Sequence, residues 1–189
     1  IAAYHNGGAQ IWKAFLESPL IAFQLITAGS DYEGATFSYA SNIIAYGDLS
    51  TYFVVRAAGL FSLFTFNSYY ANALLFASLS FSGSWALFHS FHNLYPHLTK
   101  KIAVIVLFIP SVVFLGSGIL KDTLTFAAVA WLFYAFSNIF LQKKSSPLNI
   151  IILIISGAVI LHIKIYIALC LFPSLIIFFI TSRRKKIKN

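Results

Sequence analysis

Acidic residues, cysteine and methionine are scarce in this chain. Its 189 residues include only five acids, one cysteine and no methionine, and 10% of them are charged. The lone Cys170 excludes an internal disulfide framework. Hydrophobic residues make up 59% of the chain, with a mean hydropathy of +0.83, well above the range of soluble globular domains. This composition predicts an all-α polytopic membrane protein, a transmembrane helical bundle.

Several functional signatures are also missing. The sequence has no phosphate-cradling glycine loop of the nucleotide-binding type, no nucleophile elbow and no zinc motif. The net charge of +8 does not indicate nucleic-acid binding, because nine of the thirteen basic residues occupy three clusters beside apolar runs. Such clusters are typical of membrane topology signals and of contact with anionic lipid. They are Lys100-Lys101, Lys143-Lys144 and the five cations within 183–188. We therefore expect membrane lipids, and no nucleic acid, among the partners.

The chain opens on Ile1-Ala-Ala-Tyr4-His5, without a methionine, a basic leader segment or a cleavage site. We interpret it as a piece of a longer protein.

Apolar runs predict five membrane spans. A helix of about 20 residues crosses the roughly 30 Å hydrocarbon core of a bilayer. The spans expected between residues 69 and 182 cover about 69–88, 102–120, 123–141, 148–161 and 165–180. The run 148–180 is treated as two short spans broken at His162-Ile-Lys164, because one straight helix there would be about 50 Å long. Residues 183–189 form a basic cytoplasmic tail.

Residues 1–68 are interpreted as an external loop that contains juxtamembrane helices. A helix over 11–26 suits the membrane interface, and Asp48 or Ser50 is available to cap the next helix. The segment 52–66 is short and contains Arg56, so we interpret it as juxtamembrane. The alternative, in which it is a sixth span, would place residues 1–51 in the cytoplasm.

Charge placement then predicts a shared rim. If Lys100-Lys101 is cytoplasmic, the pair Lys121-Asp122 between two spans lies outside, and so does the break at His162 and Lys164. Together with Arg56, these residues are expected at one non-cytoplasmic membrane face.

Residues Pro110-Ser-Val-Val-Phe-Leu-Gly-Ser-Gly-Ile-Leu-Lys-Asp122, followed by a helix, resemble a segment of bacterial GT-C type glycosyltransferases. These are mannosyltransferase-like polytopic enzymes, and the Bacteroidetes-type members look most similar. Tyr4-His-Asn-Gly-Gly8 is similar to the stretch after the family's catalytic acid, which would lie before Ile1. Arg56 matches an Arg ahead of the next span, and Asp122 an Asp at the outer start of a later helix. Lys164 to Pro173 resembles a short Pro-containing span headed by Lys.

The resemblance implies sugar transfer from a polyprenyl-phosphate-linked donor at the periplasmic face of the bacterial inner membrane. The acceptor would be a lipid, a glycan or a protein, and some members need a divalent metal ion. Two alternatives stay open: a transporter or flippase of lipid-linked sugars, and a non-catalytic subunit of a membrane complex.

Two acids are the candidate catalytic residues. Asp122 either stabilises a helix start or acts as the acceptor-side acid. Asp31, which forms a local carboxylate pair with Glu33, either lies in a solvated loop or acts as a base or metal contact.

The candidate substrate-binding residues are mostly cations. Lys164 interrupts a long apolar run, where a charge is costly, so a phosphate contact is favoured over snorkelling. Lys121 and Arg56 can likewise be interpreted either as phosphate contacts or as side chains that snorkel to the headgroups. His162 either supports phosphate binding or lies at the interface, and the resemblance adds Tyr4 and His5. No metal ligands are assigned, because His89 and His92 have no acid or cysteine nearby.

Overall fold

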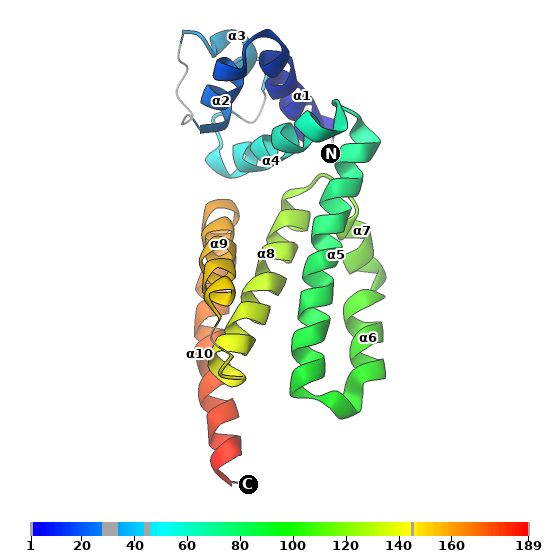
Figure 1. Ribbon diagram of the computed structural model, residues 1–189, viewed down its shortest axis with the longest axis vertical. Coiled ribbons are helices and arrows are strands. Elements are labelled where there is room, and N and C mark those ends of the chain that lie inside the picture. Colours follow the sequence, from blue (N-terminus) through cyan, green and yellow to red (C-terminus); the bar gives the residue numbers. More distant parts are fainter. Residues whose placement is uncertain (1, 28–33, 44–45, 145, 189) are drawn as a thin grey trace. The chain divides into compact units, whose positions relative to one another are not determined.

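The computed structural model describes residues 2–27, 34–43, 46–144 and 146–188, and throughout these ranges the regular elements are helices (Figure 1). The predicted all-α class is therefore confirmed. The chain divides into two compact units. Unit 1 comprises residues 1–80 and 114–124, and unit 2 comprises residues 81–113 and 125–189.

Unit 1 is built around the packing of two helices, α1 and α4. It contains α1 (Ala2–Glu17), α2 (Pro19–Thr27), α3 (Phe37–Ala40), α4 (Leu49–Thr65) and the first half of α5 (Tyr69–Leu94). It also takes the end of α7 (Pro110–Gly116) and the start of α8 (Lys121–Phe136). The core includes fully buried side chains of both chief helices and their neighbours, namely Ile11, Ala14, Leu25, Tyr46, Tyr52 and Val55.

A close backbone approach explains the Gly-Gly pair in α1. A Cβ atom on Gly8 would lie 2.9 Å from the backbone nitrogen of Gly59, so only glycine lets α1 reach α4 at this point. The stretch Tyr4 to Gly8, which resembles a family loop, is therefore helical here. The helix expected over 11–26 is divided at Ser18, because Pro19 cannot donate the next helical hydrogen bond.

Unit 2 contains the rest of α5, the 3-10 turn η1 (Pro96–Leu98), α6 (Thr99–Leu107) and the start of α7. It also contains the rest of α8, the π-helix η2 (Ser137–Leu141), α9 (Pro147–Ile163) and α10 (Ile165–Lys188). Figure 1 shows α9 alongside α10, and Ile160, Ala168 and Leu175 share a core with Leu132 of α8. Small residues bring α5 and α8 together, since a Cβ atom on Gly83 would lie 2.8 Å from the Cα atom of Ala127.

Among the residues that the structure describes, three helical stretches are long and apolar enough to cross a membrane: Tyr69–Leu94, Lys121–Leu141 and Ile165–Ser182. The helices α4 and α9 are apolar but shorter. Large apolar side chains on α9 and α10 are exposed, which is what contact with lipid requires. They include Ile151, Ile154, Ile155, Leu169, Ile176 and Ile177. The molecule is a helical protein of the membrane type.

Two predicted ranges contain helix breaks. The range 102–120 holds two helices, because the residues before Pro110 leave the helical conformation and Pro110 begins α7. The range 148–180 divides at Lys164, whose φ of −146° and ψ of 81° separate α9 from α10.

Candidate functional site

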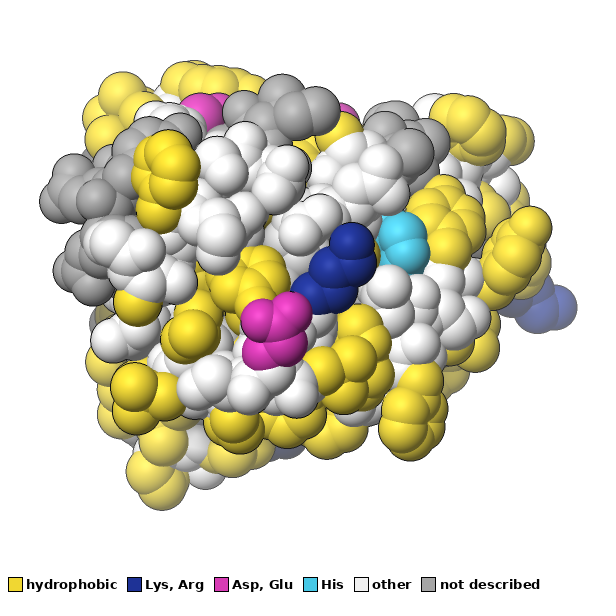
Figure 2. Space-filling view, turned by 90° about the horizontal axis from the view of Figure 1, so that it is seen from above, with side chains coloured by type: hydrophobic (Ala, Val, Ile, Leu, Met, Phe, Trp, Pro, Cys, Tyr) yellow, Lys and Arg dark blue, Asp and Glu magenta, His cyan; other side chains and the backbone are white. Residues whose placement is uncertain are grey.

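An ion pair joins the starts of two helices in unit 1. The ammonium of Lys121, the first residue of α8, lies 3.2 Å from Asp48 Oδ2 and 2.8 Å from Ser50 Oγ. The Lys121 side chain is 23% exposed and that of Asp48 is 56% exposed. Charged side chains are sparse on the face shown in Figure 2, where hydrophobic and uncharged polar groups surround them. The pair is therefore a distinctive feature of unit 1.

Asp48 also caps α4, as the sequence predicts. Its carboxylate accepts hydrogen bonds from the Ser50 N–H at 3.1 Å and from the hydroxyl of Thr51. The Thr51 hydrogen bond, with those from Lys121 and Ser50, lowers the pKa of Asp48 below its ordinary value. A carboxylate held in this ionised state is a weak proton acceptor. Its arrangement suits charge pairing and orientation better than general-base chemistry.

Arg56 lies on α4 two turns after Asp48. Its guanidinium carbon lies 4.5 Å from the centre of the Tyr52 ring, one turn back on the same helix face. Tyr52 is itself fixed, because its buried hydroxyl donates to the Leu25 carbonyl of α2. Asp48, Tyr52 and Arg56 thus form a fixed polar face at successive turns.

Asp122 is the second residue of α8 and half-buried. A carboxylate in the first turn is stabilised by the helix dipole. Its catalytic role stays a prediction.

Tyr4 and His5 lie on α1. Tyr4 packs against the unit 1 core, and the ring of His5 meets Tyr69 edge-on, 5.3 Å between centres. Burial lowers the pKa of His5, so the ring is neutral at neutral pH. A neutral ring can share a hydrogen bond but offers a phosphate no positive charge.

His162 and Lys164 belong to unit 2. The Nδ1 atom of the exposed His162 lies 3.1 Å from the Ala158 carbonyl oxygen, and Lys164 is half-buried where α9 ends. The structure brings Arg56, Lys121 and Asp122 into one unit, while the shared rim with His162 and Lys164 stays a prediction. Asp31 lies outside the described residues.

The described residues contain no group of three or more His, Cys, Asp or Glu side chains that could hold a metal ion.

Sequence reasoning missed the partnership between Asp48 and Lys121. Each residue has a local reason to stand at a helix start, but 73 positions separate them and no periodic pattern links them. The scarcity of acids was the available signal: Asp48 is the last acid before Asp122.

Comparison with protein-family models, with curated proteins and with solved structures finds no match to this chain.

Proposed function

We propose that this chain is part of an integral membrane glycosyltransferase that uses a polyprenyl-phosphate-linked sugar at the periplasmic face of a bacterial inner membrane. The observation that carries the proposal is the contact of Lys121 with Asp48 and Ser50, at the start of the candidate span Lys121–Leu141. This contact supports the proposal because it puts an ammonium and a carboxylate at the start of a candidate span. The resemblance of residues 110–122 to GT-C type enzymes supports the same assignment.

The proposed roles follow from the charges. Arg56 binds the donor phosphate and stabilises the negative charge that develops as it leaves. A phosphate contact by Lys164 stays a prediction from the sequence. Lys121 is partly neutralised by Asp48, so it orients the helix start and contributes less to phosphate binding. Asp122 assists the acceptor hydroxyl, and the resemblance assigns the proton-abstracting acid to residues before Ile1.

The proposal is tested by measuring transfer from a radiolabelled polyprenyl-phosphate sugar by the full-length protein in membrane vesicles. We expect Asp122→Asn, Arg56→Gln and Lys164→Ala each to lower the rate by about 100-fold or more, as removal of a catalytic charge does. Lys13→Ala, which removes one exposed cation from α1, is the matched control and should leave the rate unchanged.

Two results would count against the proposal. If the wild-type protein moves the labelled donor across the bilayer without transferring the sugar, the protein is a transporter. Full transfer by all three variants would remove these residues from the site.

A further inference from the structure

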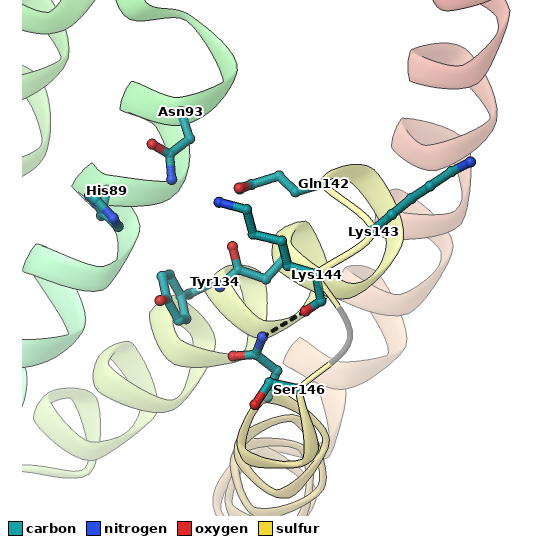
Figure 3. Close-up of a pocket in the computed structure, with 9 residues that line it drawn as sticks. His89, Asn93, Tyr134, Gln142, Lys143, Lys144 and Ser146 are labelled. Carbon is teal, nitrogen blue, oxygen red and sulfur yellow. Dashed lines mark hydrogen bonds between the residues drawn. The ribbon is translucent and has the colours of Figure 1, made fainter.

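Unit 2 contains a polar cavity of about 500 Å³ (Figure 3). The end of α5, the end of α8 with η2, and the start of α9 enclose it. Its lining includes amide, imidazole and ammonium groups, among them His89, Asn93, Asn138, Gln142, Lys144 and Asn149. We call this cavity the amide pocket. It adjoins the C-terminal end of the candidate span that Lys121 begins.

The amide pocket belongs to a unit without acids. All five Asp and Glu residues of the chain lie in unit 1, whereas unit 2 holds ten of the thirteen Lys and Arg residues. A cation bound here would find no carboxylate and would be repelled by Lys144. Lys144 is exposed, and unit 2 contains no carboxylate that could pair with it.

One amide that lines the pocket has a buried donor without a partner. The Nε2 atom of Gln142 is buried and makes no hydrogen bond to any residue that the structure describes. Asn138, which is 6% exposed, lines the same cavity. Buried amides are normally hydrogen-bonded, so an unsatisfied donor beside a cavity indicates a ligand.

The backbone turns Lys144 toward the pocket. After the π-helix η2, Lys143 has a left-handed φ of 56°, and the Lys144 N–H returns to the Asn138 carbonyl at 2.9 Å. The Asn149 amide donates to the Lys144 carbonyl at 3.1 Å and ties this turn to α9. Figure 3 shows the consequence: the Lys144 side chain points toward His89 and Asn93, whereas that of Lys143 points away. A lysine held in an unfavourable conformation indicates that the turn serves a purpose.

The start of α9 adds a positive electrostatic potential, which favours an anion. Ser146 precedes the helix without capping it through its side chain, and Pro147 occupies the first turn. The N–H groups of Asn149 and Ile150 donate to the Ser146 carbonyl, so the contribution of this helix start is its dipole. The positive end of the 17-residue helix α9 lies beside the pocket.

We propose that the amide pocket binds a phosphate group, carried either by a lipid headgroup or by a free anion. Phosphate oxygens can accept hydrogen bonds from several donors at once, which fits an ammonium, an unsatisfied amide donor, a second amide and a helix start arranged around one cavity. This site is separate from the transferase residues, and its existence does not depend on sugar transfer.

Two probes distinguish the sources of the phosphate. The protein is placed in phosphatidylcholine nanodiscs, and its thermal unfolding midpoint is followed while inorganic phosphate is added. In a second series the nanodiscs contain increasing phosphatidic acid, and bound lipid is counted by native mass spectrometry. Stabilisation by the free anion indicates a soluble phosphate ligand, and selective retention of phosphatidic acid indicates a lipid headgroup.

Neighbouring lysines supply a matched control. Lys144→Gln should raise the phosphate concentration or lipid fraction needed for half saturation about tenfold, as loss of a charge-assisted hydrogen bond does. Lys143→Gln makes the same charge change at the edge of the cavity, where the side chain points away from the other lining residues (Figure 3). It should alter the half-saturation value less than twofold. Lys144→Arg should retain binding, and Asn138→Ala should weaken it at unchanged net charge.

Equal losses of phosphate or lipid affinity in Lys143→Gln and Lys144→Gln would show that binding depends on the overall surface charge and not on the pocket. That result would overturn the proposal. So would a wild-type protein that responds to neither probe. If Lys144→Gln fails to fold, binding by Asn138→Ala and Lys144→Arg tests the proposal instead. Full phosphate binding by Asn138→Ala would contradict the assigned lining of the pocket.

Discussion

The two units differ in how they balance their charges. Unit 1 contains all five acids and only three Lys or Arg residues, and it pairs charges within the protein, as in Lys121 with Asp48. Unit 2 contains ten such cations and no acid, so each of its charges must face water, lipid phosphate or a ligand. Unit 1 can form ion pairs between its own residues, whereas unit 2 has no carboxylate side chain with which to form one. We therefore expect the stability of the two units to respond differently to packing changes, to acid and to anions.

The largest expected effect concerns packing in unit 2. Gly83→Ala would place a Cβ atom 2.8 Å from the Cα atom of Ala127, and overpacking of this kind costs about 1–3 kcal/mol. Gly157→Ala is the matched control, since its nearest neighbour lies 3.9 Å away. The free energy of unfolding in mixed detergent micelles checks both. Equal stability of the two variants would mean that α5 and α8 do not approach closely at Gly83.

The corresponding change in unit 1 is Gly8→Ala, where the obstacle is the backbone nitrogen of Gly59 at 2.9 Å. We expect a similar loss of about 1–3 kcal/mol, with faster amide hydrogen exchange in α1 and α4. Gly47→Ala, whose added Cβ would meet nothing within 4 Å, should leave both measurements unchanged. If Gly8→Ala accelerates exchange in α9 and α10 as strongly as in α1, the two units are not separate in stability.

A buried amide in unit 1 should matter somewhat less. Asn72 is fully buried, and its Nδ2 donates to the Ala58 carbonyl at 3.0 Å and the Ser62 hydroxyl at 2.9 Å. Asn72→Ala leaves those acceptors of α4 without this donor and should cost about 1–2 kcal/mol of unfolding free energy. Asn6→Ala, at an exposed position on α1, serves as the control. If Asn72→Ala leaves the free energy of unfolding unchanged, this amide does not hold α5 to α4.

The smallest effect is a pH dependence in unit 1. Because the folded-state pKa of Asp48 is lowered, its stabilising contribution is fully present above the unfolded pKa of about 3.9. The contribution is lost progressively as the pH falls from that value through the lower folded-state pKa. Asp48→Asn keeps a capping side chain but loses this charge. The wild type should therefore be slightly more stable than Asp48→Asn at pH 6, and the difference should shrink steadily as the pH falls below about 4. A difference that grows on acidification would have the wrong sign.

Much of the fold could be predicted from the sequence because the deciding signals are local. The length of the apolar runs predicts helices, and the polar residues His162 and Lys164 predict a break, that the structure also contains. The break before Pro110 falls within a range that is predicted to be one span. Asp48 was predictable as a cap because capping depends on residues a few positions away.

The candidate site was less accessible because it depends on contacts between distant residues. The pairing of Lys121 with Asp48 and the close approach of Gly8 to Gly59 involve helices far apart along the chain. The amide pocket had a faint signal, since Asn138 and Gln142 are spaced by four residues at the end of an apolar run. That spacing places two amides on one helix face, but it does not reveal which neighbours complete the cavity.

The most direct test of the account is the sidedness of the charged residues. In a Cys170→Ser background, single substitutions Ser117→Cys, His162→Cys and Ser146→Cys are labelled in intact cells with a membrane-impermeant maleimide. The account predicts that positions 117 and 162 react from outside, and that position 146, beside the amide pocket, reacts only after the cells are opened. Labelling of position 162 together with 146, and not with 117, would contradict the shared rim and the sugar-transfer proposal built on it.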